Sequence, residues 1–224
     1  MTAYEAAIFD LDGLLVDSEI LWHRAELELL VPLGAKIDAT ATRATKGMFV
    51  GEVVDHYHAL AAWESPPRDE LIDQLLDRVG SLVEAEGRLL PGATRALELC
   101  AALGPCALAS STPRALIERV LAHFGLAGAF DVVHSAEDEP SGKPNPAVYL
   151  TTARLLALDP RRCLAFEDSP AGVRSATSAQ MGCVAVPTPA ERDDPAFELA
   201  TVVLGSLDEL DERWLERKFA HDRP

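Results

Sequence analysis

The sequence predicts an α/β protein in which a parallel β-sheet carries an inserted, entirely helical segment. One short apolar run precedes residue 18, and after residue 88 such runs alternate with helical patterns, as in a parallel sheet covered on both faces. Between residues 18 and 88, no run alternates apolar and polar residues as a strand would. We therefore predict a Rossmann-like core made of residues 1–17 and 89–224, and a helical cap made of residues 18–88.

The expected strands are short apolar runs bounded by turn or helix signals. They are residues 6–9, 105–110, 130–134, 163–166, 183–186 and 201–204. The expected helices carry apolar residues at helical spacing and stop near Gly or Pro. They are residues 20–33, 51–63, 68–86, 93–103, 113–124, 146–158 and 169–181, with a charged helix near the C-terminus.

Composition and charge exclude several classes of function. The chain has 224 residues and a formal net charge of -16, which disfavours nucleic acid and anionic membranes as partners because both are polyanions. No uncharged apolar stretch is long enough to span a bilayer, and the N-terminus shows no export signal. Cys100, Cys106, Cys163 and Cys183 lack the CxxC spacing of a metal site. We expect buried thiols in a reducing cytoplasm.

The segment around Asp10 and Asp12 is the first candidate for chemistry. An apolar run ends at two aspartates one residue apart, and Gly13 lets the backbone turn away at once. A turn at this point can aim the two carboxylates at opposite sides of one bound group. Such a division suits a nucleophile and a separate acid. Because ligands bind beyond the carboxyl ends of parallel strands, Asp10 should meet Ser110 and the pair Glu167-Asp168 there.

The pattern Asp-x-Asp-Gly-x-x-x-Asp-Ser-Glu, which starts at Asp10, resembles the first motif of the haloacid dehalogenase-like hydrolases. Most members of that family transfer phosphoryl groups with Mg²⁺ through an aspartyl-phosphate. The resemblance implies that Asp10 is the nucleophile and that Asp12 is the acid and base. It spans nearly the whole chain, because three further motifs follow in the order that the family requires.

The run 108–112 resembles the second motif, in which a Ser or Thr at the end of a strand binds phosphate. That resemblance assigns the phosphate to Ser110, with Ser111 beside it. A helix start is the alternative interpretation, since Thr112 before Pro113 could serve as an N-cap without any catalytic role. Both can hold, with Ser110 binding phosphate and Thr112 capping the helix.

The run 141–146 resembles the third motif, whose lysine, here Lys143, offsets the charge of the nucleophile and the phosphoryl group. Pro144 and Pro146 stiffen the backbone on either side, which limits the entropy lost in placing the ammonium group. A solvated lysine in a turn is the alternative. An acidic protein that handles a dianion needs such a cation, together with a metal ion.

The run 165–173 resembles the fourth motif, whose acids hold the metal ion. The resemblance implies that Asp10, the backbone carbonyl of Asp12, and Asp168 are direct Mg²⁺ ligands. Glu167 would bind directly or through water. Acids near a helix start also interact with the helix dipole, but this explains one carboxylate better than two in tandem. His56 and His58 point apart on a helix and do not share an ion easily.

The position of the helical segment resembles the cap of the beta-phosphoglucomutase-like branch. The local sequences of residues 81–84, 89–92 and 167–169 look most like those of its hexitol-phosphate and 2-deoxyglucose-6-phosphate phosphatases. The resemblance therefore implies a phosphatase for a small phosphorylated sugar or polyol. Where mutases of that branch have a hinge-helix histidine, this chain has Trp22, and His23 is turned about 100° around the helix. The pair Lys46-Gly47 is not followed by the arginine that binds a second phosphate in mutases.

Two other functions stay open at this point. One is a sugar phosphomutase, and the other is a metabolite-binding protein without catalytic activity, because a fold alone does not guarantee activity. The sequence names neither the phosphorylated metabolite nor the cap residues that select it. It also leaves the oligomeric state open and is compatible with a monomer.

Overall fold

The computed structural model describes residues 3–37, 45 and 48–219. Six parallel strands form one sheet in the order β3-β2-β1-β4-β5-β6. They are β1 (Ala6–Phe9), β2 (Cys106–Ser110), β3 (Val132–Ser135), β4 (Cys163–Glu167), β5 (Gly182–Ala185) and β6 (Val202–Val203). The predicted α/β architecture with a parallel sheet is confirmed.

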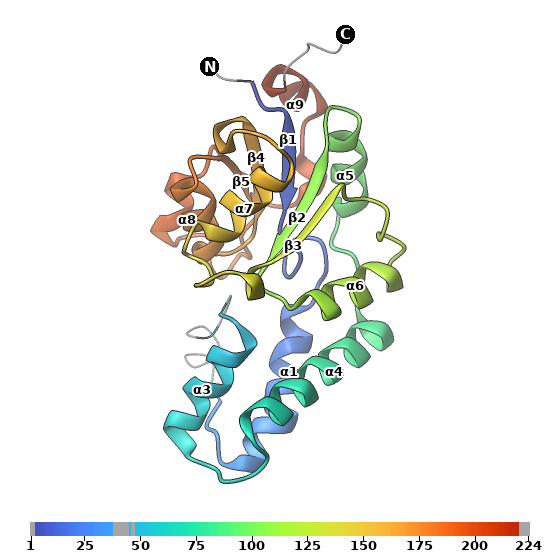
Figure 1. Ribbon diagram of the computed structural model, residues 1–224. Coiled ribbons are helices and arrows are strands. Elements are labelled where there is room, and N and C mark those ends of the chain that lie inside the picture. The colour runs from blue at the N-terminus through green and yellow to red at the C-terminus, as the bar shows by residue number, and fades with distance from the viewer. Residues whose placement is uncertain (1–2, 38–44, 46–47, 220–224) are drawn as a thin grey trace.

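Helices connect the strands and cover the sheet (Figure 1). The α-helices are α1 (Glu19–Leu30), α3 (Val50–Ala61), α4 (Arg68–Glu86), α5 (Ala93–Ala101), α6 (Arg114–His123), α7 (Ala147–Leu155), α8 (Pro170–Ser178) and α9 (Glu212–Lys218). Short 3-10 segments are Val31–Leu33, Ala136–Asp138, Pro160–Arg162, Pro195–Leu199 and Leu207–Glu209.

Strand β1 lies at the centre of the sheet and is buried on both faces. Phe9 pairs with Leu108 of β2 and with Phe166 of β4. Alternate residues of β1 enter two different hydrophobic clusters: Phe9 packs with residues of α5 and α6, whereas Ile8 packs with residues of α7 and α8. This two-sided burial explains why β1 is a continuous apolar run.

The helices α1, α3 and α4, here called the insertion helices, lie together beyond the carboxyl ends of the strands (Figure 1). The start of β1 and helix α9 lie at the opposite end of the sheet. Helix α4 packs against α1, α3 and α6, so it joins the insertion to the core. The described residues between 18 and 88 contain no strand, as the sequence predicts. The division into a core and a cap domain at residues 17/18 and 88/89 stays a prediction.

Several element boundaries differ from the sequence prediction. Strand β3 begins at Val132 and not at residue 130, because Phe130 packs edge-on against Phe9, and the Asp131 carboxylate accepts the backbone N–H of Cys106. Most helices end earlier than the apolar pattern suggests; α7 ends at Leu155 and α8 at Ser178. Apolar residues beyond those helix ends still pack on the core, so the hydrophobic pattern extends past the last helical turn.

The four cysteines are free and buried, as expected for small core residues. None of the helices in the described part of the chain has the combination of length and apolar composition that crossing a membrane requires. The cytoplasmic location expected from the sequence stays a prediction.

Candidate active site

Three of the four motifs meet in one buried cluster at the carboxyl ends of β1 and β4. The Lys143 ammonium donates hydrogen bonds to Asp10 Oδ1 at 2.7 Å, to Glu167 Oε1 at 2.7 Å and to the carbonyl of Ala109 at 3.1 Å. Asp168 follows Glu167 directly, and both side chains are buried. Residues more than 130 positions apart in the sequence are thereby brought into contact.

Two glycines allow the backbone to approach these acids closely. A Cβ atom at Gly172 would lie 1.9 Å from the Glu167 carboxyl group, and one at Gly13 would lie 2.4 Å from Asp168 Oδ2. Gly13 also has φ +77°, a conformation that costs a residue with a side chain more than it costs glycine. Gly172 is therefore required for steric reasons, and Gly13 for both steric and conformational reasons.

Lys143 is buried between two acids and is not a solvated turn residue. Its side chain is only 3% exposed. Burial disfavours the charged ammonium, but the attraction of Asp10 and Glu167 outweighs burial and raises the pKa of Lys143 above its usual value. The group is therefore a permanent cation at neutral pH, fixed by three acceptors.

Burial raises the pKa of Asp10 to about 7, and the nearby Lys143 ammonium opposes that rise. Glu167 and Asp12 add to the rise, because like charges disfavour a further carboxylate. The two opposing effects place Asp10 near its ionisation midpoint at neutral pH. A second cation beside Asp10 would favour the ionised form.

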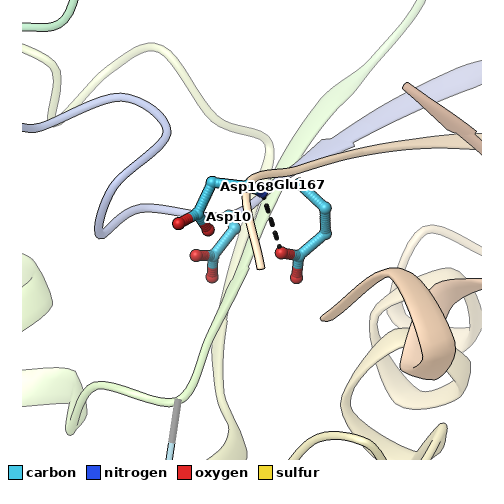
Figure 2. Close-up of side chains that lie close together, drawn as sticks. All are labelled: Asp10, Glu167 and Asp168. Carbon is cyan, nitrogen blue, oxygen red and sulfur yellow. Dashed lines mark hydrogen bonds between the residues drawn. The ribbon is translucent and has the colours of Figure 1, made fainter. Parts of the chain in front are cut away.

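Figure 2 shows the side chains of Asp10, Glu167 and Asp168 close together at the ends of their strands. One carboxylate oxygen from each lies within 4.8 Å of the others, an arrangement that could hold a metal ion. Buried carboxylate oxygens are hard ligands of the kind that Mg²⁺ prefers. The donor set therefore fits the cation that the sequence predicts. The carboxylate of Asp12 is not part of this group.

Glu167 already accepts several hydrogen bonds from protein groups. Its Oε1 atom accepts from Lys143 and from the Tyr149 hydroxyl, each at 2.7 Å. Its Oε2 atom accepts from the backbone N–H of Asp168 at 3.1 Å and from the Ser169 hydroxyl at 3.2 Å. Burial and the adjacent Glu167 raise the pKa of Tyr149 well above its usual value, so its hydroxyl stays a donor. The sequence contained no signal that identified Tyr149.

The second motif lies at the end of β2, beside the cluster. Ser110 is buried and its hydroxyl accepts the backbone N–H of Thr112 at 3.1 Å. Ser111 Oγ is buried and has no hydrogen-bond partner, and it lines the same cavity as Asp10. The capping role expected for Thr112 is wrong. Helix α6 begins at Arg114 without a side-chain cap, and the Arg114 backbone N–H is donated to Glu137.

The Thr112 hydroxyl instead holds Asp12. It donates to Asp12 Oδ2 at 2.6 Å, while Asp12 Oδ1 accepts from the Ser18 hydroxyl at 2.6 Å and from Trp22 Nε1 at 3.0 Å. Ser18 and Trp22 belong to the start of α1, so the orientation of Asp12 depends on the insertion as well as on the core. From the sequence, Trp22 is interpreted only as the absence of a histidine, and its contact with Asp12 is not predicted. An indole N–H four residues after Ser18 was the available signal.

A cavity of about 430 Å³ joins these groups to the insertion helices. The core side is lined by Asp10, Asp12, Ser110, Ser111, Lys143 and Asp168. On the insertion side, α3 and α4 contribute apolar side chains, whereas α1 contributes Trp22 and the polar side chains of Glu19, His23 and Glu26. Among the described residues that line the cavity, Lys143 is the only lysine or arginine. The pair Lys46-Gly47 lies outside the described residues.

This arrangement matches known proteins in sequence and in fold. Residues 4–180 match the model of the haloacid dehalogenase-like hydrolases. The chain is 44% identical to hexitol phosphatase B of Escherichia coli K12 over 207 residues, which cover 92% of this chain and 93% of that protein.

Solved structures show the same fold. A crystal structure of beta-phosphoglucomutase from Clostridium difficile has a TM-score of 0.83 and 25% identity, and the match covers 96% of each chain. CbbY from Rhodobacter sphaeroides, in complex with phosphate, also has a TM-score of 0.83, with 27% identity over 92% of this chain and 96% of that one. Because the family model covers most of the chain and the four motif sites converge, this chain belongs to the haloacid dehalogenase-like hydrolases.

Proposed function

We propose that this protein is a Mg²⁺-dependent phosphatase that hydrolyses a small sugar or polyol phosphate through an aspartyl-phosphate. The contact of Lys143 with Asp10 and Glu167 is the observation that carries the proposal, because Asp10 and Lys143 also line the core end of the cavity. The 44% identity to hexitol phosphatase B supports the substrate class. The cavity volume of about 430 Å³ falls within the range usual for small-molecule sites.

Asp10 is the proposed nucleophile. Its carboxylate attacks phosphorus, so that an Asp10 O–P bond forms while the ester O–P bond breaks. Lys143, which is 2.7 Å from Asp10, offsets the negative charge that accumulates between nucleophile and phosphoryl group. The Ser110 and Ser111 hydroxyls would donate to phosphoryl oxygens. The unpartnered, buried Ser111 Oγ supports this role.

Asp12 is the proposed acid and base. It gives a proton to the leaving oxygen in the first step, and the alcohol departs. In the second step it takes a proton from the water that attacks the aspartyl-phosphate, which releases inorganic phosphate and restores Asp10. The hydrogen bonds from Thr112, Ser18 and Trp22 fix the orientation of Asp12 in this structure. Because two of these donors lie at the start of α1, a shift of α1 would change the aim of the carboxyl group.

Asp10, Asp168 and the backbone carbonyl of Asp12 would hold the Mg²⁺ ion. When bound, the ion neutralises charge on the transferring phosphoryl group. Both oxygens of Glu167 already accept hydrogen bonds from the protein. Glu167 would therefore position Lys143 and would contact the metal ion through water.

The insertion helices would act as the cap that the sequence predicts at residues 18–88. Their side chains line one side of the cavity, which would keep bulk water from the first step. The partner is a small metabolite, and the sequence-based expectations that the protein binds neither nucleic acid nor a membrane stay predictions.

A sugar phosphomutase is the second candidate, and the fold shared with beta-phosphoglucomutase favours it. A mutase must bind a substrate that carries a second phosphate. The described lining of the cavity has no lysine or arginine on the insertion side, and it places the Glu26 carboxyl group there. The chemistry of that lining supports the phosphatase. A metabolite-binding protein without activity would not need the buried Asp10–Lys143–Glu167 cluster, which is costly to bury.

Phosphate release from a panel of hexitol, hexose and pentose monophosphates, with Mg²⁺ and with EDTA, tests the proposal. We expect release with Mg²⁺ and none in EDTA. A coupled assay should detect negligible interconversion of beta-glucose 1-phosphate and glucose 6-phosphate. Isomerisation faster than phosphate release would establish the mutase, and full turnover in EDTA would contradict the metal assignment.

A further inference from the structure

Glu26 occupies an unusual place for a carboxyl group. It lies on the buried face of α1 with Leu21, Ala25 and Leu30, and only 7% of its surface is exposed. It lines the cavity on the insertion side, away from the Lys143 cluster. Its Oε2 atom is buried and has no hydrogen-bond partner. The proposed mechanism gives Glu26 no task.

The insertion side of the cavity combines apolar and polar side chains. Met48, Val50, Val53 and Leu75 line it together with Glu19, His23 and Thr45, and no described residue there is a lysine or arginine. Burial raises the pKa of Glu26 to about 7. A substantial fraction of the carboxyl groups is therefore protonated at neutral pH, and a protonated carboxyl can donate one hydrogen bond and accept others.

A buried carboxyl group without a partner destabilises the fold, and a leucine would suit the position better on packing grounds. A ligand that enters the cavity can supply the missing partner. The partner must be compatible with a phosphate bound at the other end, and an alcohol hydroxyl is a donor and an acceptor at once. Among the described residues that line this end, a second phosphate would meet two acids, Glu19 and Glu26, and neither a lysine nor an arginine.

We propose that Glu26 hydrogen-bonds a hydroxyl of the leaving alcohol and thereby selects monophosphates of polyhydroxylated alcohols that carry no second anionic group. This inference rests on the proposed function, because a leaving alcohol exists only if a phosphate ester is hydrolysed. It names the part of the substrate that the cluster around Lys143 does not recognise. Glu26 would bind substrate and take no part in proton transfer.

The test compares the full-length wild type with Glu26→Leu and Glu26→Gln on two substrates. One is a hexitol 6-phosphate, and the other is p-nitrophenyl phosphate, whose leaving group has no alcohol hydroxyl. Glu26→Leu should lower kcat/KM about 10- to 100-fold on the hexitol phosphate, the size expected for a lost buried hydrogen bond. It should leave p-nitrophenyl phosphate within about threefold, because the change stays on the alcohol side of the cavity.

Glu26→Gln keeps a donor and an acceptor, so it should restore most of the lost activity. The matched control is Glu28→Gln, because Glu28 lies on the same helix but pairs with Arg24 and Arg78 on the surface. Glu28→Gln should behave as wild type on both substrates. Should Glu26→Leu fail to fold, Glu26→Ala is assayed on the same two substrates, with the melting temperature as the check of folding.

The outcomes separate this inference from the proposed function. If the wild type hydrolyses p-nitrophenyl phosphate but no hydroxylated monophosphate, the proposed substrate class is wrong and the inference falls with it. If the wild type hydrolyses the hexitol phosphate and the Glu26 variants lose equal activity on both substrates, Glu26 is structural and only the inference is overturned. If Glu26→Leu loses activity on the hexitol phosphate alone, the inference that Glu26 binds the leaving alcohol is supported.

Discussion

The two ends of the cavity are built on opposite electrostatic principles. At the core end, Asp10, Glu167 and Lys143 are all buried, but each charge lies 2.7 Å from an opposite one. At the insertion end, Glu26 is equally buried, but within residues 3–37, 45 and 48–219 its Oε2 atom has no hydrogen-bond partner, and no lysine or arginine lines that end of the cavity. Burial is the same at the two ends, whereas the compensation of charge is not.

This difference indicates that the two ends of the cavity have different roles. A compensated cluster holds its geometry whether or not a ligand is present, as the stabilisation of developing charge requires. An uncompensated carboxyl group gains a partner only when a ligand arrives, so its interaction contributes to the choice of ligand. Substitutions at each end of the cavity test whether the two carboxyl environments differ in this way.

The largest effect is expected at the core end from Asp10→Asn, which removes the proposed nucleophile. We expect phosphate release to fall by at least about 10⁴-fold. EDTA should abolish the wild-type activity in the same assay, and added Mg²⁺ should restore it. Asp17→Asn, an exposed change nearby, is the control and should keep activity. A loss of phosphate release smaller than about 10⁴-fold for Asp10→Asn would show that Asp10 is not the nucleophile.

Asp12→Asn tests whether Asp12, at the core end of the cavity, acts as the general acid and base. The change should lower turnover of a sugar phosphate about 10²- to 10⁴-fold, the usual size of general acid–base catalysis. With p-nitrophenyl phosphate, whose leaving group needs little protonation, rapid-mixing kinetics should show a smaller loss in the first step than in the second. Equal losses in both steps on both substrates would contradict the assignment.

Lys143→Met removes the compensation itself and leaves two buried carboxylates without their cation. The free energy of unfolding should fall by about 3–5 kcal/mol, the cost of breaking a buried ion pair by removing one partner. Urea unfolding at pH 8, where Asp10 is ionised in the wild type, measures the loss. Lys36→Met on the surface is the control, and it should change stability by less than about 0.5 kcal/mol. Similar values for the two variants would mean that the cluster is not compensated.

Glu26→Gln tests the insertion end of the cavity through the pH dependence of protein stability. The pKa of Glu26 is raised from its ordinary value of 4.5 to about 7, so the folded state holds the proton more tightly than the unfolded state. This stabilisation is complete below pH 4.5 and is lost as pH rises through 7. Relative to Glu26→Gln, the wild type should lose up to about 3 kcal/mol between pH 4.5 and 8.

Melting temperatures of the two proteins across that range measure the effect. The same comparison with Glu28→Gln should give no such trend, because Glu28 is ion-paired and its pKa is lowered by Arg78 and Arg24. If the difference in melting temperature between wild type and Glu26→Gln were the same at all pH values, the Glu26 carboxylate would have a partner that compensates its charge.

The smallest effect is expected from Trp22→Phe, where the two ends of the cavity are linked. Phenylalanine keeps much of the packing but removes the Nε1–H that Asp12 accepts at 3.0 Å. Two other donors remain, so kcat on a sugar phosphate should fall only about tenfold, with a smaller change in KM. Trp214→Phe on α9 is the control. An unchanged kcat would mean that Ser18 and Thr112 hold Asp12 without Trp22.

The strands and the motif residues at their ends were predictable because both are encoded locally. The apolar run of β1 stops at Asp10, and that of β4 stops before Glu167-Asp168, so a parallel sheet had to bring these acids to the same edge. The sequence also indicated that Lys143 belongs with them. Helix ends were less accurate, because apolar residues that pack beyond the last turn of α7 extend the same pattern.

Local sequence patterns were therefore enough to predict the class of fold, the family and the acids of the core end. The groups that hold Asp12 became visible only in the folded protein, since Thr112 lies 100 residues away along the chain. The tertiary structure also decided that Glu26 faces a cavity and not an apolar partner. The physical reason is that a hydrophobic pattern specifies which face of an element is buried, whereas the partner of each buried polar group depends on how distant elements pack.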